Sequence, residues 1–162
     1  MFMKKAAVLF AAIAAFAGAS AMAEVYHAKE GEIVIHYNRA DGNYGTEPCT
    51  YDTCWGVHAW GDAYDSEGQW TKPTFWKGKD DFGVYYVLKA NEDKEMLENA
   101  WANYILHKAQ LKDQGGADMS FEVKAGKEIY IVNNDCKTYT KMEEAMAAKA
   151  SPKNDCKEVV KF

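Results

Sequence analysis

The chain has 162 residues, 14% of them aromatic, and a formal net charge of −5. This acidic balance argues against nucleic acid as a partner, because phosphate binding needs a cationic surface. The length suits one domain with a sizeable core and leaves no room for a second domain of normal size.

The N-terminus carries two lysines, a short apolar run and the small residues 20–23. This order is typical of a secretory signal peptide, so we predict that residues 1–23 are removed by cleavage after Ala23. A retained membrane anchor would need about 18 apolar residues, and this run is shorter. We therefore expect a secreted or periplasmic protein of about 139 residues, without a membrane partner after cleavage and with a charge of about −7.

Six segments have the β-branched and aromatic composition of strands, and turn residues separate them. Short strands at this spacing predict an all-β fold, a single antiparallel β-sandwich of the immunoglobulin-like kind. The predicted strands are 32–38, 55–60, 82–88, 104–108, 120–123 and 128–132.

Two segments favour helix. Residues 91–101 could form a helical turn that buries Met96, Leu97 and Trp101, and residues 141–149 consist of strong helix formers. We therefore divide the mature chain into two parts. These are a β-sandwich over residues 24–135 and a short C-terminal helical extension over residues 136–162.

The predicted exported part contains four cysteines, an even number that favours disulfides in an oxidising compartment. The sequence permits three pairings. We favour Cys49–Cys54 and Cys136–Cys156, because each pair encloses a loop-like or terminal segment that a crosslink would tether. A four-cysteine zinc site is disfavoured, since its ligands usually occur as closely spaced C-x2-C pairs.

The stretch WGVHAW, residues 55–60, contains two tryptophans and a histidine. Side chains alternate across a strand, so Trp55 is expected on the same apolar face as Val57 and Ala59. We expect Trp55 to be structural. His58 and Trp60 share the opposite face, where a ring stays open unless another segment covers it.

Two motifs occur in the same order as in a known protein family. Residues 35–44 read IHYNRADGNY and residues 55–61 read WGVHAWG, and the match continues through 80–83, 105–108 and 112–113 to about residue 132. The sequence resembles the bacterial pullulanase-associated domain, the family 41 carbohydrate-binding module, whose pattern is I-H-Y-x-R-x-D-G-x-Y followed by W-G-L-H-x-W-G.

The resemblance implies a β-sandwich that binds α-1,4-linked glucans such as pullulan, amylopectin, glycogen or maltodextrins, without catalysis or a cofactor. It also implies an amylolytic enzyme as a partner, because the family is usually attached to a glycoside hydrolase. Carried over by position, the carbohydrate-binding residues are His58 and Trp60 on the strand, with Lys112 and Asp113 in a later loop.

The sequence departs from the family pattern near the expected site. Residues 45–54 form a longer, cysteine-bearing insertion before the tryptophan strand, at the expected edge of the groove. Some relatives have a further tryptophan before the Lys-Asp pair, where this chain has Leu111. One stacking surface is therefore missing or is supplied by Trp70 or Trp76.

Other functions remain as alternatives. Exposed Trp and Tyr are also favoured in protein interfaces, so the same sandwich could be an exported interaction module. A glycosidase needs two carboxyls across a cleft, and nothing distinguishes such a pair among Asp80, Asp81, Asp113 and Asp118. The four histidines do not form the close pairs typical of a metal site, so we expect no metal.

Overall fold

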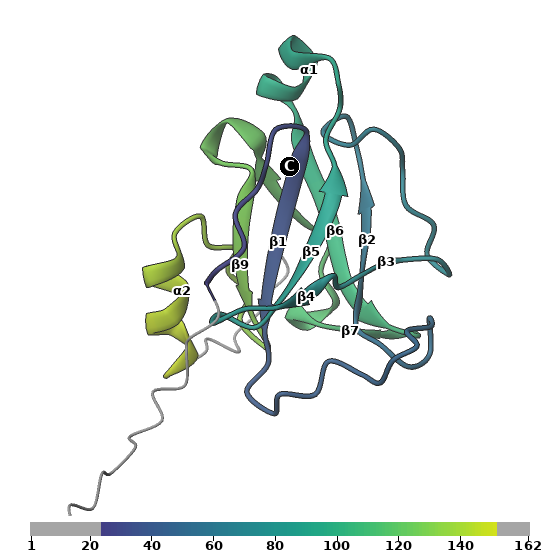
Figure 1. The fold of residues 1–162 in the computed structure, drawn as a ribbon, viewed down its shortest axis with the longest axis vertical. Coiled ribbons are helices and arrows are strands. Elements are labelled where there is room, and N and C mark those ends of the chain that lie inside the picture. Colours follow the sequence, from purple (N-terminus) through teal and green to yellow (C-terminus); the bar gives the residue numbers. More distant parts are fainter. Residues whose placement is uncertain (1–23, 152–162) are drawn as a thin grey trace, which may run out of the picture.

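The computed structural model describes residues 24–151, which form two packed β-sheets with two short α-helices (Figure 1). The first sheet has the strand order β4-β5-β1-β9, and the second has the order β3-β2-β6-β7, with β8 also paired to β6. This arrangement confirms the predicted β-sandwich. No helix within residues 24–151 is long and apolar enough to cross a membrane.

The first sheet consists of β1 (Glu32–Asn38), β4 (Gly78–Lys79), β5 (Val84–Lys89) and β9 (Glu128–Val132). The second consists of β2 (Gly56–Trp60), β3 (Thr74–Phe75), β6 (Trp101–Lys108), β7 (Leu111–Lys112) and β8 (Met119–Glu122). The helices are α1 (Lys94–Asn99) and α2 (Met142–Lys149), and two 3-10 turns lie at Gln114–Gly116 and Val123–Ala125.

Alternation along the strands builds the core between the sheets. Every second residue of each long strand is buried, and these residues form one apolar cluster. From β1, β5 and β9 it receives Ile33, Ile35, Tyr37, Val84, Tyr86, Leu88, Ile129 and Ile131, and from β2 and β6 it receives Val57, Ala59, Ala102, Tyr104 and Leu106.

One strand pairing differs from the expected antiparallel arrangement. β9 runs parallel to β1, with Ile35 beside Ile129 and Tyr37 beside Ile131, whereas β1 and β5 are antiparallel. Parallel neighbours need a long connection, and here residues 39–127 lie between the two strands. The sandwich is therefore closed at this edge by a contact between the first and last strands.

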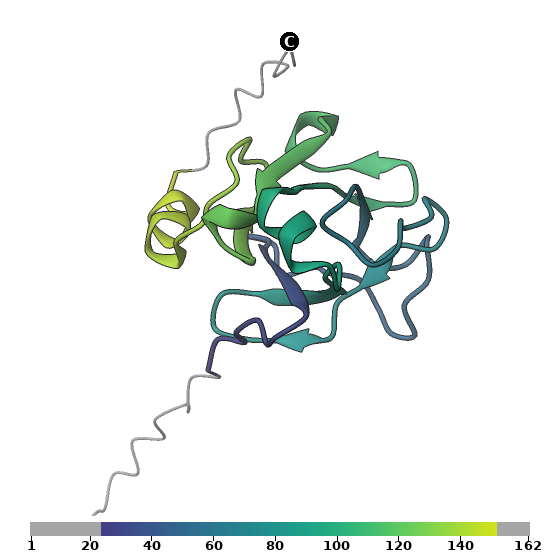
Figure 2. The same ribbon diagram turned by 90° about the horizontal axis from the view of Figure 1, so that it is seen from above.

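The C-terminal helix lies against the first sheet. α2 packs beside β9, at the left of Figure 1, and buries Ala145 in a second small cluster with Tyr130 and Tyr139. Viewed from above, α2 stands at one side of the sandwich (Figure 2). The outer face of the second sheet is thus left uncovered by this helix. The predicted signal peptide, residues 1–23, lies outside the described residues.

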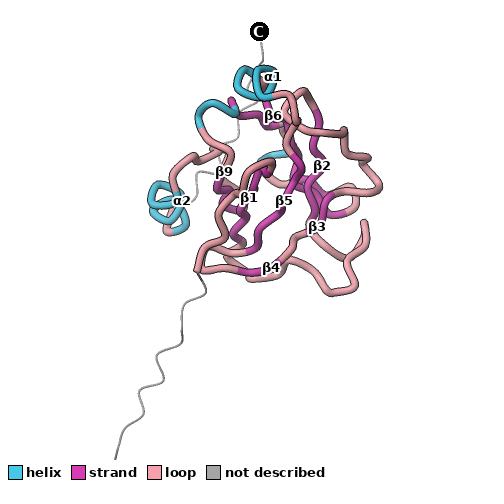
Figure 3. The backbone as a smooth tube through the Cα atoms, turned by 45° about the horizontal axis from the view of Figure 1, so that its top comes forward, coloured by secondary structure: helices cyan, strands magenta, loops and turns pink. Residues whose placement is uncertain are grey.

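The predicted helical turn after β5 is present, but only part of its expected buried side is correct. α1 lies at one end of the sandwich (Figure 3), and Asp93 caps its N-terminus by accepting a hydrogen bond from the Met96 amide. Leu97 is buried, whereas Met96 and Trp101 are exposed by 48% and 53%. The helix ends at Asn99, so Trp101 belongs to β6 and follows the alternation of that strand instead.

Candidate functional site

The aromatic strand β2 presents two rings on the outer face of the second sheet. His58 and Trp60 are partly exposed and stack with 5.1 Å between ring centroids. Trp55, Val57 and Ala59 are buried in the core. The predicted alternation of this segment is therefore confirmed, and Trp55 has a structural position beneath the Arg39 guanidinium.

Trp70 joins these rings from the loop after β2. The loop returns along the strand because the Gly68 amide donates to the Ala59 carbonyl at 2.7 Å. A Cβ atom at Gly68 would lie 3.0 Å from that carbonyl oxygen, so the close approach favours glycine. The Trp70 indole then stacks on His107, with 3.9 Å between ring centroids and an interplanar angle of 11°. Its edge-on contact with His58 joins the two strands' rings into one surface.

The disulfide-closed loop before β2 holds Trp70 in place. The Trp70 indole N–H donates to the Tyr51 hydroxyl at 3.0 Å, and Gln110 Nε2 donates to the same oxygen at 2.6 Å. The Tyr51 carbonyl accepts from the Ala109 amide at 2.8 Å, which ties the loop to the turn after β6. The insertion predicted at the groove's edge thus contacts one of the groove's rings.

The Cys49–Cys54 disulfide closes this loop and confirms the first predicted pairing. The second predicted pairing, Cys136 with Cys156, involves a residue outside the described part of the chain.

Trp60, His58 and Trp70 line an open groove of about 340 Å³ with charged and polar side chains at its rim. Lys112 Nζ lies 5.3 Å from the centroid of the Trp70 ring, and Asp118 lies on the same rim. The remaining lining residues are Ile105 and Gln110. An ammonium and a carboxylate beside aromatic rings provide a donor, an acceptor and an apolar surface in one place.

The pKa values of His58 in the groove and His107 beneath Trp70 are both lowered, which favours the neutral imidazole. Burial lowers the pKa of His58, opposed by the negative charges of Asp118 and Glu67, and burial also lowers the pKa of His107. His107 is fully buried, and its Nδ1 lies 3.0 Å from the Ala109 carbonyl oxygen. Neutral rings stack on Trp60 and Trp70 without placing a buried positive charge under the indoles.

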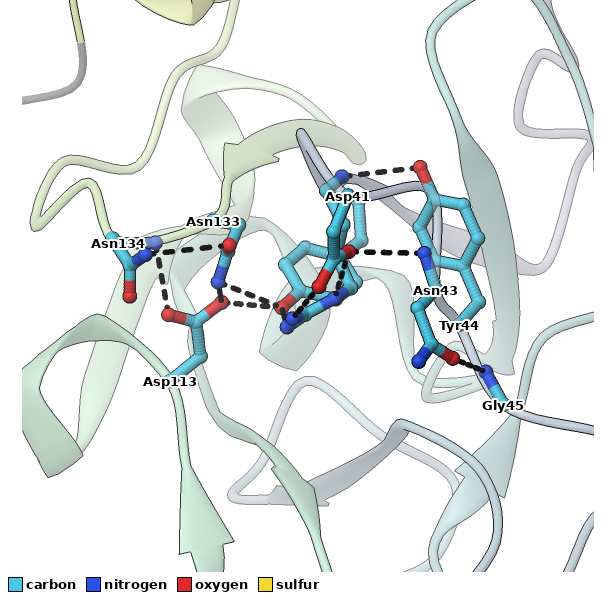
Figure 4. A network of polar contacts seen from close by, with 9 residues as sticks. Asp41, Asn43, Tyr44, Gly45, Asp113, Asn133 and Asn134 are labelled. Carbon is cyan, nitrogen blue, oxygen red and sulfur yellow. Dashed lines mark hydrogen bonds and ion pairs between the residues drawn. The ribbon is translucent and has the colours of Figure 1, made fainter.

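The expectation that Asp113 faces a ligand is corrected by the structure. Asp113 is only 5% exposed, and its carboxylate accepts hydrogen bonds from the Tyr37 hydroxyl, Asn133 Nδ2 at 2.9 Å and the Asn134 amide at 2.9 Å (Figure 4). The Gln114 amide donates at 2.7 Å to the same carboxylate. Asp113 therefore joins β7 to the end of β9 and does not reach the groove.

Strand alternation explains why the predicted Lys-Asp pair separates. Lys112 is exposed at the end of β7 and points to the groove, so the next side chain turns toward the interior. The family motif at residues 35–44 is likewise structural, since Arg39 donates to the Tyr37 hydroxyl at 2.9 Å and binds Asp41 through two nitrogens. The motif and Asp113 thus form one polar network that runs from the buried Asp113 to the exposed Asp41 (Figure 4).

A family model described as the bacterial pullanase-associated domain matches residues 31–140. The chain belongs to this family. An α-amylase of Streptomyces lividans is 34% identical to it over 80 residues, which are 49% of this chain and 7% of the amylase.

Solved structures show the same fold as this pullanase-associated domain. A Klebsiella pneumoniae pullulanase complexed with maltotriose superposes with a TM-score of 0.59 at 20% identity, over 79% of this chain and 12% of the enzyme. Family 41 carbohydrate-binding modules from streptococcal virulence factors, solved in a study of α-glucan recognition, give a TM-score of 0.56 at 18% identity, over 72% of this chain and 50% of theirs. The domain spans only a small part of the enzymes it resembles.

Three residues of the groove were not assigned to it from the sequence, namely Ile105, Gln110 and Asp118. Asp118 follows the two glycines after β7, and these glycines adopt positive φ values of 68° and 80°. Such a turn can carry the chain back to the groove, so this spacing was the available signal. Of the two tryptophans considered as substitutes, Trp70 lies in the groove, whereas Trp76 packs against the core.

A larger hollow of about 500 Å³ lies beside α1, but its lining differs in kind from the groove. No aromatic residue lines it, and four of its charged side chains form the ion pairs Lys89–Glu92 and Lys94–Glu30. Within residues 24–151 there is also no group of three His, Cys, Asp or Glu side chains placed to hold a metal ion. The aromatic groove of the pullanase-associated domain is therefore the candidate site.

Proposed function

We propose that this domain binds α-1,4-linked glucans, without catalysis, in the groove formed by His58, Trp60 and Trp70. The observation that carries the proposal is the pair of partly exposed indoles on one open sheet face, joined by neutral imidazoles and bordered by Lys112 and Asp118. Similarity to modules that were solved in a study of α-glucan recognition supports the choice of ligand.

Stacking supplies the apolar part of the interaction. A pyranose presents a C–H face that covers an aromatic ring, and removing about 60 Å² of apolar surface from water contributes about 1.5 kcal/mol. Trp60 and Trp70 together offer two such surfaces. Because association has its own entropic cost, two rings and a few hydrogen bonds predict an affinity in the micromolar to millimolar range.

The rim supplies orientation through sugar hydroxyls. Lys112 donates and Asp118 accepts, and charge-assisted hydrogen bonds are stronger than those between neutral groups. Asp113 is absent from this proposal because its carboxylate is buried and already accepts four hydrogen bonds. Asp118 takes the acceptor role that was expected of Asp113.

Catalysis is not part of the proposal. Hydrolysis of a glycosidic bond uses two carboxyl groups on either side of that bond. Asp118 is the one carboxylate among the described residues that line the groove. We infer that the domain holds a glucan chain, such as pullulan, amylopectin, glycogen or a maltodextrin, beside an amylolytic enzyme in an exported setting.

Affinity electrophoresis tests the proposal. The wild-type domain is expected to migrate more slowly in gels that contain amylopectin or pullulan and to release no reducing sugar. Trp60→Ala is expected to restore normal migration. Met146→Ala, which truncates an exposed apolar side chain on α2, is the control and should remain retarded. Normal migration of the wild type would instead favour the protein-interaction module, and released sugar would favour a hydrolase.

A further inference from the structure

Trp101 is the tryptophan with the greatest exposure and has no role in the groove described above. It begins β6 with 53% of its surface exposed, whereas the other four tryptophans are partly or fully buried. A large indole exposed to water is unfavourable by the hydrophobic effect, so contact with the apolar face of a ligand would be favourable.

Strand register places Trp101 on the same face as the groove. Ala102, Tyr104 and Leu106 point into the core, so Trp101, Asn103 and Ile105 point outward. Asn103 is paired with Trp60 and Ile105 with His58 across the two strands. Trp101 is therefore a diagonal neighbour of Trp60, at the end of the face that lies away from Trp70.

The surface between the two indoles is polar and partly exposed. Asn103 Nδ2 donates to the Trp60 carbonyl at 3.2 Å. On the other side of β6, Ser120 is paired with Asn103 and Glu122 with Trp101. Two apolar rings separated by hydroxyl, amide and carboxylate groups match a sugar chain, which presents C–H faces and hydroxyls in turn.

The continuous outer face is longer than the groove alone. From His107 beneath Trp70 to Trp101, β6 advances six residues, or about 20 Å along the strand. The indoles of Trp70, Trp60 and Trp101 are spread along this length. A chain that occupies the groove can therefore continue over Asn103 to Trp101 without leaving the sheet.

We propose that Trp101 forms an additional stacking subsite for the same glucan chain, so that the domain binds long chains more tightly than short ones. This inference rests on the proposed function. One further stacked pyranose is expected to strengthen binding about tenfold for a ligand long enough to reach both ends of the face. A ligand that fills only the groove gains nothing from Trp101.

Calorimetry with maltotriose and maltoheptaose tests this inference. Trp101→Ala is expected to weaken maltoheptaose binding about tenfold and to leave maltotriose binding unchanged, whereas Trp60→Ala weakens both. Trp101→Phe keeps an aromatic ring and should retain part of the preference for the longer sugar. Trp101→Leu keeps an apolar side chain without a ring and should lose that preference. Thermal unfolding of each variant verifies that it is folded.

The outcomes separate this inference from the proposed function. Unchanged maltoheptaose binding by Trp101→Ala, together with weakened binding by Trp60→Ala, overturns the additional subsite and leaves the groove intact. An equal loss for both sugars in Trp101→Ala also overturns it, because Trp101 then acts on the groove itself. If the wild type binds neither sugar nor amylopectin, the proposed function fails, and Trp101 is not a glucan subsite.

Discussion

Replacing Asp113 with asparagine separates a structural role from a ligand-binding role. The side chain keeps its size, but one acceptor oxygen becomes an NH2 group. Asp113 Oδ1 accepts from the Gln114 and Asn134 amides, and Oδ2 accepts from Tyr37 and Asn133. If the new NH2 group takes the Oδ1 position, it faces two backbone N–H donors, whereas in the Oδ2 position it faces only the Asn133 amide group as a donor, because the Tyr37 hydroxyl can turn to accept from it.

The cost follows from these lost bonds. A hydrogen bond to a charged group contributes about 1.5–3 kcal/mol, so losing one in a buried site and weakening the others by removal of the charge predicts a loss of about 2–4 kcal/mol in unfolding free energy. For a domain of this size, that loss corresponds to a fall in Tm of about 6–16 °C. The tyrosine also responds, because burial and the Asp113 charge both raise the pKa of Tyr37. Removing that charge takes away one of the causes that raise the pKa of Tyr37.

Urea unfolding and affinity gels, run at a temperature where both proteins are folded, measure the two effects separately. Asp113→Asn should be destabilised yet retarded by amylopectin as the wild type is. The matched control is Lys112→Ala, an exposed neighbour, which should weaken retardation and leave the unfolding free energy within about 0.5 kcal/mol. The reasoning is refuted if Asp113→Asn unfolds as the wild type does but no longer binds the glucan.

Three further measurements address the groove. Tyr51→Phe removes the hydroxyl that accepts a hydrogen bond from the Trp70 indole, so calorimetry should show glucan binding weakened about fivefold. An affinity equal to that of the wild type would mean that stacking on His107 alone holds the ring. Replacing Cys49 and Cys54 together with serine opens the same loop and should lower the unfolding free energy by about 2 kcal/mol, which denaturant titration in parallel with the wild type measures. Burial lowers the pKa of His107 in the folded protein, so the unfolded chain takes up a proton first as the pH falls below about 6.5. The free energy of unfolding should therefore decrease below this pH. A series of thermal melts from pH 8 to 5 that shows no decrease in Tm would contradict this assignment.

Much of the fold could be predicted from local pattern. The bounds predicted for β1 and β9 agree with the structure, since both strands are rich in β-branched and aromatic residues, which are buried along most of their length. The second helix begins one residue later than predicted. The strands missed were β3, β4 and β7, each two residues long, and such segments are too short to show a periodic pattern.

The candidate site could be predicted only in part. Alternation was enough to place His58 and Trp60 outward and Trp55 inward. It did not place Trp70, because a loop has no periodicity, and the contacts that hold it come from Tyr51 and Gly68 through separate hydrogen bonds. Alternation did not place Asp118 either, because it lies in a loop after a turn of two glycines.

The sequence by itself therefore determined the family through its motifs, and it determined the β-sandwich and the inward or outward sides of residues 55–60 because strand period and turn chemistry are local properties. The tertiary structure alone decided that Asp113 is an internal acceptor, that β9 runs parallel to β1, and that Trp101 lies exposed on the face of Trp60. These outcomes depend on donors, strand partners and neighbours that lie tens of residues apart along the chain, and only folding brings them within the few ångströms at which hydrogen bonds and ring contacts act.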